Sequence, residues 1–589
     1  MVFYAIIMSM IKKVPYGLAN FEKIKENGAF YYVDKTPFIA KLEDLGSQFH
    51  FFLRPRRFGK SLFLSTLEHY YDPRRSGQFQ ELFGDTWIGQ NPTPLKNKLP
   101  ILKFNFSGIA TYGTLEEIQH SFNLKIQDNL NSFYIKYGQS YGLNPDFEER
   151  YSRFGNAGDA LNHFIEVMSD KQVKYLMLID EYDNFANNVL VHHGAEKYQA
   201  ITHAGGFLRS FFAAIKVATE SRTVERLFVT GVSPLVLSDV TSGMNIGDNI
   251  SPMIDFNALA GFTQDEVEAM LDYYIAQGMV PASQRIEILE LMKVHYNHYC
   301  FSENTTQRLY NSDMVLYFFN KFHQEKKIPS NLMDENVRID YGKLQYLVTE
   351  GPKLNGNFTI LGEIMDQQQT DCNLVHSFAL ADIIESNKFK SFLYYLGLLT
   401  IQEHKYGSKV VLSIPNEVVR TMHYSYLRGA LEDGYGLKLD VNLLTKEFDN
   451  LAFKGQWQKI IGHILDRLYQ TVSLRDFVFR EQVVKSYLLA WLGMTPLYFV
   501  QSEPEMNGGY ADIFLQKNYF TTDLTQHEYL IEVKFLSAEE QKAPDAVAYQ
   551  KAAAIAQLER YATGQTITCT LHKLVVLAGA RELLLLEEV

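Results

Sequence analysis

Continuous apolar runs alternate with amphipathic stretches along the first 255 residues of the chain. Four of these runs are rich in β-branched or aromatic residues, namely residues 49–53, 99–107, 175–180 and 226–231. Strands buried on both faces have this composition, and their alternation with helices is typical of a parallel sheet covered by helices. The pattern predicts an α/β domain over residues 1–255, with a helix or strand in its apolar opening, residues 1–10.

The rest of the chain predicts three further regions. Residues 256–330 open with a capping-box pattern at Thr263 and predict a helical lid. Residues 331–470 predict a mainly helical connector, in which a helix followed by a hairpin that turns at Gly407 is winged-helix-like. Residues 471–589 predict a smaller α/β domain. Its expected elements are a helix over 479–492, strands over 510–516, 529–536 and 573–579, and a helix around 554–562.

Composition narrows the class of protein. The chain has 589 residues, of which 46% are apolar, so it has material for several packed domains. Its cysteines, Cys300, Cys372 and Cys569, lie far apart, which excludes a disulfide framework and a thiolate zinc site. No apolar run approaches the length of a membrane span, so we expect a soluble cytoplasmic protein without a membrane partner. The net charge of −12 means that any nucleic-acid-binding surface has to be local.

A candidate phosphate site follows the first predicted strand. The segment Arg54-Pro-Arg-Arg-Phe-Gly-Lys-Ser61 lies between this strand and a predicted helix, where backbone N–H groups and the helix dipole face an anion. We expect Lys60 to reach the β- and γ-phosphates of ATP and Ser61 to ligate Mg²⁺. Arg54 stands at the first glycine of the usual signature GxxxxGK[ST]. The predicted nucleotide-binding residues are Arg54, Arg57, Phe58, Gly59, Lys60, Ser61, Leu62 and Thr230.

Two acidic residues, Asp180 and Glu181, stand at the end of the strand over 175–180. At this position of a P-loop enzyme, an aspartate holds Mg²⁺ through water and a neighbouring glutamate polarises the attacking water. The alternative is that Asp180 caps the next helix. Because a Gly-Lys-Ser turn precedes this strand, we favour Asp180 as a metal ligand and Glu181 as a catalytic residue. Thr230 either touches the γ-phosphate or belongs to a simple turn at the end of its strand.

The N-terminal motifs resemble one family. They are Phe21-Glu22-Lys23-Ile24, Tyr32-Val33-Asp34-Lys35-Thr36, Arg54-Pro-Arg-Arg-Phe-Gly-Lys-Ser61, Gly261-Phe-Thr263 and Tyr310-Asn311. Together they resemble the AAA-ATPase-like domain family of bacterial and archaeal proteins over residues 14–325. An arginine at the first-glycine position is normal in that family. The resemblance implies a P-loop NTPase fold and nucleotide binding, but it does not by itself imply turnover.

A second constellation lies in the C-terminal region. Asp512 lies in one predicted strand, and Glu532 and Lys534 stand at i and i+2 on the next, so these two side chains share a face. Two carboxylates beside a lysine can hold Mg²⁺ and steer a hydroxide toward a phosphodiester. The alternative is an ordinary exposed strand face. The surrounding segment is apolar, and charge is costly there unless it is paired or bound to metal, which favours a metal site.

The order of these elements resembles the PD-(D/E)XK nuclease superfamily over residues 475–580. The resemblance is carried by Ser502-Glu503, Gly509-Tyr-Ala-Asp512 and Ile531-Glu-Val-Lys534, with Glu481 on the preceding helix and Gln557 on the following one. It implies a restriction-endonuclease-like α/β domain that acts on DNA or RNA. The implied catalytic residues are Asp512, Glu532 and Lys534, and the implied metal ligands are Glu481, Asp512 and Glu532. Tyr510 stands where the family pattern has an arginine, so the substrate contacts are expected to differ.

Two functions stay open at this point. In the first, which we favour, ATP hydrolysis positions a Mg²⁺-dependent nuclease domain on nucleic acid. In the second, the chain is a nucleotide-dependent switch or scaffold whose C-terminal domain binds nucleic acid without cleaving it. Residues 471–589 carry 10 basic and 15 acidic side chains, which favours the second. Whether the chain forms a homo-oligomer is left open.

Overall fold

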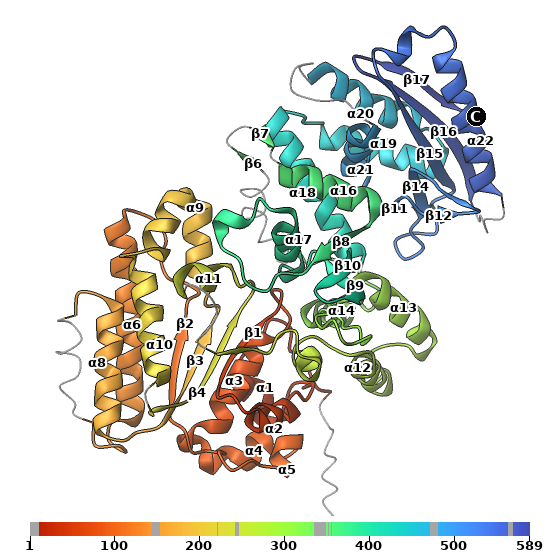
Figure 1. The fold of residues 1–589 in the computed structure, drawn as a ribbon. Coiled ribbons are helices and arrows are strands. Elements are labelled where there is room, and N and C mark those ends of the chain that lie inside the picture. Colours follow the sequence, from red (N-terminus) through yellow and green to blue (C-terminus); the bar gives the residue numbers. More distant parts are fainter. Residues whose placement is uncertain are drawn as a thin grey trace, which may run out of the picture. The chain divides into compact units, whose positions relative to one another are not determined.

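The computed structural model describes residues 11–143, 154–220, 222–241, 247–334, 349–350, 353–354, 356–471, 481–563 and 569–589. The chain forms two compact units (Figure 1). The N-terminal unit consists of Met1–Val337 and Cys372–Val410, and the C-terminal unit of Arg338–Asp371 and Val411–Val589. The predicted element over residues 1–10 lies outside the described residues, and the division into four regions stays a prediction.

A five-stranded parallel sheet lies at the centre of the N-terminal unit. Its strand order is β2-β3-β4-β1-β5. The strands are β1 (Phe49–Leu53), β2 (Ile101–Asn105), β3 (Tyr175–Asp180), β4 (Val224–Gly231) and β5 (Asp248–Asn249). All six residues of β3 are buried, as the continuous apolar run predicted for a strand covered on both faces. The parallel α/β architecture of this region is confirmed.

Helices cover both faces of this sheet. Figure 1 shows α6, α8 and α10 together on one side and α3 on the other. The helices of the unit are α1 (Phe21–Lys25), α2 (Pro37–Asp44), α3 (Lys60–Tyr71), α4 (Phe79–Phe83), α5 (Trp87–Gln90), α6 (Leu115–Tyr137), α8 (Ala157–Asp170), α9 (Asn184–Thr202), α10 (Phe207–Glu220), α11 (Leu235–Thr241), α12 (Gln264–Ala276), α13 (Arg285–Tyr296), α14 (Ser312–Glu325) and α17 (Ser386–Tyr395). Within the described part of the chain, no helix combines the length and the apolar composition needed to cross a membrane.

The predicted capping box starts α12. The Thr263 hydroxyl accepts from the Glu266 backbone N–H at 3.3 Å, and the Glu266 carboxylate accepts from the Thr263 N–H at 2.8 Å. Two donors of the first turn are thereby satisfied. The ammonium of Lys35, one of the motif residues, lies 2.7 Å from Glu266. This ion pair ties the start of the chain to the helical segment that follows the sheet.

A mixed sheet forms the C-terminal unit, with strand order β11-β14-β15-β16-β17. The strands are β11 (Tyr498–Ser502), β14 (Ile513–Lys517), β15 (His527–Leu536), β16 (Thr570–Gly579) and β17 (Leu583–Glu588), and a short hairpin is formed by β12 (Glu505–Met506) and β13 (Gly509–Tyr510). β15 and β16 pair in parallel and the other neighbours are antiparallel. The three predicted strands of this region correspond to β14, β15 and β16.

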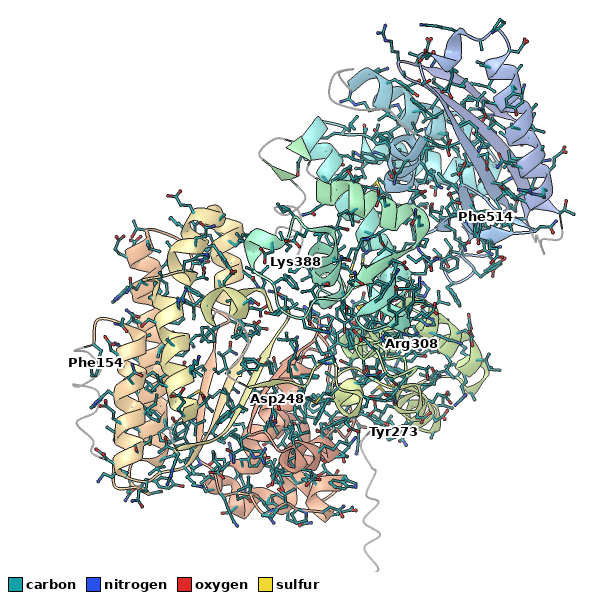
Figure 2. All side chains as sticks on the ribbon, viewed as in Figure 1. Phe154, Asp248, Tyr273, Arg308, Lys388 and Phe514 are labelled. Atoms are coloured by element: carbon teal, nitrogen blue, oxygen red, sulfur yellow. The ribbon has the colours of Figure 1, made fainter. Side chains whose placement is uncertain are left out.

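Helix α22 (Ala546–Ala562) closes the core of this sheet. Its residues Ala554 and Leu558 are completely buried, and they belong to the same core cluster as Phe514 of β14. Figure 2 labels Phe514. The other helices of the unit are α16 (Gly356–Gln367), α18 (Glu417–Tyr435), α19 (Val441–Lys454), α20 (Gln458–Thr471) and α21 (Glu481–Leu492). α21 confirms the described part of the helix predicted over 479–492.

The predicted helix and hairpin are present in the segment that precedes α18. The hairpin strands are β9 (Thr400–Tyr406) and β10 (Lys409–Ser413), and β8 (Gln369–Asn373) joins them in a sheet of order β8-β10-β9. Gly407 has a φ of 56°, as a residue in a tight turn often requires. Two very short strands, β6 (Thr349–Glu350) and β7 (Lys353–Leu354), pair with each other earlier in the chain. The likeness to a winged helix stays a prediction.

Candidate functional site

The loop between β1 and α3 has the geometry of an anion nest. α3 begins at Lys60, directly after Gly59 with its φ of 92°, and Arg57 has a φ of 63°. Alternation of left-handed and right-handed residues turns successive N–H groups toward one side, where a helix N-terminus adds its dipole. Ser61 and Leu62 are half-buried in the first turn of α3. The predicted strand, loop and helix are therefore present.

The Lys60 ammonium is buried inside this loop. It donates to the carbonyl oxygens of Arg54 at 2.9 Å and Pro55 at 2.8 Å. Burial lowers its pKa to about 8, against the opposing effect of the nearby Glu181 and Asp180 carboxylates. A cation with so little hydration gains more from a phosphate contact than an exposed one does.

Asp180 lies at the carboxyl end of β3 and is buried. It accepts a hydrogen bond of 2.6 Å from the Thr230 hydroxyl at the end of the neighbouring strand β4. Helix α9 begins only at Asn184, so Asp180 does not cap it. Thr230 is completely buried and its hydroxyl orients this carboxylate, which is a different role from the predicted contact with the γ-phosphate.

Glu181 is half-buried beside this carboxylate. Burial raises its pKa above the ordinary value, and the charge of Asp180 raises it further. Asp183, which sequence reasoning missed, accepts from the backbone N–H groups of Val232 at 3.2 Å and Ser233 at 3.1 Å. Its position three residues after Asp180, in Asp-Glu-Tyr-Asp, is the signal that could have found it.

The side chain of Arg54 lies in the core instead of facing the phosphate position. The guanidinium is buried between the rings of Phe52 and Phe301, each 4.5 Å away. Its Nη1 donates to the carbonyls of Leu53 and Ser251, both at 2.9 Å. Any contact of Arg54 with a nucleotide must therefore come from its backbone. This arginine at the first-glycine position stabilises the loop through its contacts in the core.

Arg57 and Phe58 also anchor the loop to later segments. The Arg57 Nη1 lies 2.7 Å from Asp313 and 3.0 Å from Asp334. The buried Phe58 ring packs edge-on against Tyr299, with centroids 4.9 Å apart. These two predicted ligands are thus engaged by protein groups, and they fix the conformation of the loop.

Gly261 lies between two other motif residues, Phe58 and Tyr310. Its N–H donates to the Phe58 carbonyl at 2.8 Å, and its φ is 84°. A Cβ at this position would lie 3.0 Å from the Tyr310 carbonyl oxygen and 3.1 Å from the Phe58 ring. The space between these two residues therefore admits glycine only.

Gly261→Ala is expected to reduce the stability of the N-terminal unit by about 1–3 kcal/mol, because left-handed backbone strain adds to steric crowding. The matched control is Gly278→Ala, at a φ of 68° with nothing within 4 Å of the added Cβ. Thermal unfolding followed by circular dichroism measures both losses. Equal losses in the two variants would contradict the role of the Phe58 contact.

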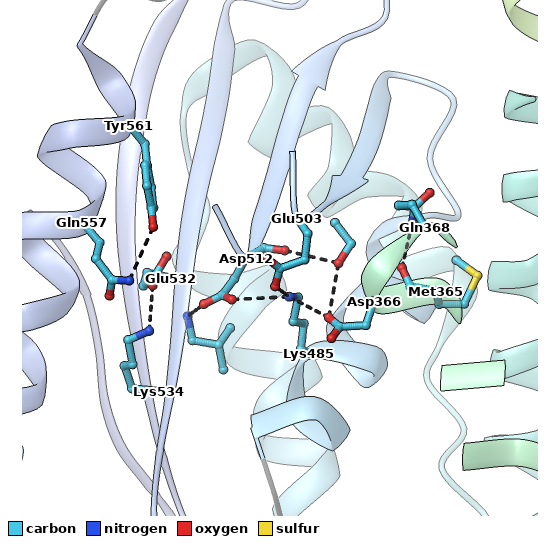
Figure 3. Close-up of polar contacts among 12 residues, drawn as sticks. Met365, Asp366, Gln368, Lys485, Glu503, Asp512, Glu532, Lys534, Gln557 and Tyr561 are labelled. Carbon is cyan, nitrogen blue, oxygen red and sulfur yellow. Dashed lines mark hydrogen bonds and ion pairs between the residues drawn. The ribbon is translucent and has the colours of Figure 1, made fainter. Parts of the chain in front are cut away.

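The second site lies where β14 and β15 pair. Asp512 directly precedes β14, and its Oδ2 accepts from the Val533 N–H of β15 at 2.7 Å. Glu532 is 1% exposed, and its Oε1 accepts from the Lys534 ammonium at 2.7 Å. Burial raises the pKa of Glu532 to about 7, and the charge of Asp512 adds to this effect. The predicted Asp512, Glu532 and Lys534 are brought together (Figure 3).

Glu481 faces the same group of residues from the start of α21. Burial raises its pKa, and the charge of Asp512 raises it further, while Lys534 opposes the shift. The Gln557 amide donates to the Tyr561 hydroxyl at 3.4 Å. Tyr510, at the position where the family pattern has an arginine, is 57% exposed.

Lys485 is the residue of this site that sequence reasoning missed. Its ammonium lies 2.6 Å from Asp366 of α16 and 3.3 Å from Asp512, and it also pairs with Glu503 (Figure 3). Glu503 was noticed as a motif residue, but Asp366 lies 119 positions before Lys485 and gave no signal. The lysine stands one helical turn after Glu481, a spacing that places both on one face of α21.

The donor set fits Mg²⁺. Among the described residues, no three His, Cys, Asp or Glu side chains are arranged to hold a metal ion together. Mg²⁺ is commonly bound by only one or two carboxylates, with water completing its coordination. Asp512 and Glu532 meet this requirement. The buried Glu532 Oε2 has no hydrogen-bond partner among the described residues, as expected of an oxygen reserved for a cation.

The fold and the two sites define a chain that joins a P-loop NTPase-like unit to a mixed-sheet domain with a carboxylate–lysine site. Residues 15–241 match the family described as "Predicted AAA-ATPase", and residues 479–580 match the PD-(D/E)XK nuclease superfamily. The chain therefore carries an AAA-ATPase-like domain followed by a PD-(D/E)XK nuclease-superfamily domain. Both resemblances are thus confirmed, the first over residues 15–241 of the predicted 14–325, so that its later motifs at Gly261 and Tyr310 lie outside the match.

Individual relatives are distant. An uncharacterized protein from the vnfD 5′ region of Azotobacter chroococcum is 29% identical over 330 residues, which cover 55% of this chain and 56% of that protein. The chain thus spans about half the length of this relative. A Walker-type ATPase of Pyrococcus abyssi has 12% identity and a TM-score of 0.37 over 70% of this chain and 98% of its own. The Aeropyrum pernix ORC2 protein has 11% identity and a TM-score of 0.30 over 70% and 93%.

Proposed function

We propose that the chain hydrolyses ATP at the loop before α3 and uses its C-terminal domain as a Mg²⁺-dependent nuclease on DNA or RNA. The ATPase half rests on one observation above all. The buried Lys60 ammonium lies in the loop, and the charges of Glu181 and Asp180 act on it to raise its pKa against the effect of burial. The cation, the two acids and the start of α3 therefore face one site. This combination matches the requirements of phosphoryl transfer to water.

In the proposed reaction, the Lys60 ammonium exchanges the Arg54 and Pro55 carbonyls for phosphate oxygens. Ser61 and Asp180 are the residues that would hold Mg²⁺. Glu181 orients the attacking water, for which its raised pKa makes it a better base than an exposed glutamate. Bound Mg²⁺ supplies charge neutralisation at the phosphates.

In the nuclease half, Asp512 and Glu532 are the residues that would hold the metal, and Glu481 faces them from α21. A bound divalent ion supplies Lewis acidity at the phosphodiester. The Lys534 ammonium, fixed 2.7 Å from Glu532, stands ready to neutralise the charge that develops on the attacked phosphate. The main support for this half is the buried Glu532 Oε2, which has no hydrogen-bond partner within the described part of the chain.

The switch or scaffold is the second candidate. It is favoured by the acidic balance of residues 471–589 and by the lysine that already neutralises Asp512. In this alternative, nucleotide binding alters the chain and the C-terminal domain binds its partner without cleaving it.

Incubation of the full chain with supercoiled plasmid, single-stranded DNA and RNA tests the proposal. We expect cleavage of at least one substrate with Mg²⁺, none with EDTA, and phosphate release from ATP in the same preparation. A chain that releases phosphate but leaves every substrate intact would favour the switch. A chain that shows no nucleotide uptake by calorimetry would refute the ATPase half.

A further inference from the structure

Lys485 is a buried cation in the middle of an apolar helix. Its side chain is 3% exposed, and its neighbours on α21, Val484 and Leu488, are completely buried. Removing an ammonium from water is costly unless opposite charges surround it. The carboxylates of Asp366 and Asp512 supply that charge, because they lie 2.6 Å and 3.3 Å from the ammonium. The side chain is therefore present as a cation.

Three carboxylates from separate segments surround this cation. Asp366 comes from α16, Glu503 follows β11, and Asp512 precedes β14. Asp366 lies 137 positions before Glu503 and 146 before Asp512, so the fold assembles the cluster. Glu503 has a φ of 49°, a left-handed conformation that is uncommon for a residue with a side chain. The segment after β11 thus adopts this conformation while its carboxylate pairs with the ammonium.

The two oxygens of Asp512 divide the pocket into two halves. Oδ1 faces the Lys485 ammonium at 3.3 Å, and Oδ2 accepts from the Val533 N–H on β15. On the β15 side, Glu532 pairs with Lys534 through Oε1, and its Oε2 has no hydrogen-bond partner among the residues that the structure describes. The Lys485 ammonium thus occupies the Oδ1 side of Asp512, whereas the Glu532 side retains a buried carboxylate oxygen that neither lysine neutralises directly.

We propose that Lys485 is a resident cation that leaves room for at most one divalent metal ion, on the Glu532 side of the pocket. The inference rests on the proposed metal-dependent function of this domain. In a two-metal site, the two ions lie about 3.5–4 Å apart, with a carboxylate between them. Here the ammonium stands at the Asp512 oxygen that a second ion would need, and like charges at such a distance repel strongly in a buried site.

Counting bound Mn²⁺ on the full chain without nucleotide tests this inference. Lys485→Met alone would leave three carboxylates without their counterion, so the decisive variant combines Lys485→Met with Asp366→Asn and removes one charge of each sign. Asp366→Asn alone is the matched control because it retains the lysine. Sites belong to this pocket if they disappear when Asp512→Asn is added. Circular dichroism compares the folding of the variants.

We expect one Mn²⁺ in this pocket for the wild type and for Asp366→Asn, and two for the double variant. One Mn²⁺ in all three would overturn the inference and leave the proposed metal site standing. No Mn²⁺ in the wild type but one in the double variant would support the resident cation and refute the proposed metal-dependent function. No Mn²⁺ in any of them would refute both.

Discussion

Lys60→Ala is expected to lower ATP turnover by at least about 100-fold, because one preorganised donor to the reacting group contributes about 10²–10³ in rate. The ammonium is already desolvated, so its contact with phosphate requires only that phosphate oxygens replace the Arg54 and Pro55 carbonyls. The methyl group of alanine leaves those carbonyls and the phosphates without a cation. Phosphate release under saturating ATP measures the effect on kcat, and calorimetry with a non-hydrolysable analogue measures the effect on binding.

The matched control for this experiment is Lys103→Ala. Lys103 pairs with Glu68 of the same helix α3 at 2.7 Å, but it lies on β2 and away from the loop. Its loss removes a half-buried ion pair that has no contact with the loop, so it affects stability and not the site, and the turnover of the folded variant should stay near that of the wild type. A folded Lys60→Ala variant with turnover within threefold of the wild type would contradict the assignment of the site.

The central strands of both units could be predicted, because buried strands consist of apolar residues that are visible in the local sequence. β1 and β3 coincide with the predicted runs, since strands buried on both faces need continuous apolar residues. β5 could not be predicted, because its two residues, Asp248 and Asn249, carry no hydrophobic signal; they pair in parallel with His50 and Phe51 of β1. β17 was missed for a different reason: its sequence, LLLLEE, is apolar, but so short an apolar run does not by itself distinguish a strand from a helix.

Side-chain roles within the site were harder to predict than the site itself. The cationic loop predicted phosphate contacts for Arg54 and Arg57, yet one guanidinium is buried between two phenylalanines and the other pairs with Asp313 and Asp334. Apart from Phe52, these partners lie 247 to 277 positions away along the chain. The local sequence shows that a charged side chain is present, but only the fold shows which groups neutralise it.

Lys485 illustrates the same limit in the C-terminal unit. Within an amphipathic pattern, a single lysine on a helix is ordinarily read as a solvent-facing residue. Its burial becomes intelligible only once Asp366, Glu503 and Asp512 are seen around it. Conversely, Glu532 and Lys534 could be predicted, since charges inside an apolar strand demand a partner or a metal.

Lys534→Ala is expected to abolish metal-dependent cleavage, with a fall of at least about 100-fold, while ATP turnover stays unchanged. The ammonium is fixed by Glu532, so it is in position before the phosphate charge develops. Lys534 donates no lone pair to a metal, and its removal takes a positive charge away from the carboxylates. Mn²⁺ binding to the full chain should therefore be retained or strengthened, which distinguishes this variant from Asp512→Asn, where cleavage and metal binding should both be lost.

Lys517→Ala is the matched control on the same sheet. Lys517 lies on β14, and its ammonium donates to the Asp523 carbonyl at 3.0 Å, away from the carboxylates of the site. Cleavage of the substrate that the wild type prefers, measured with Mg²⁺ in excess, should be equal in Lys517→Ala and the wild type. Retained cleavage in Lys534→Ala together with its loss in Asp512→Asn would mean that the metal alone neutralises the phosphate, and the role assigned to Lys534 would be wrong.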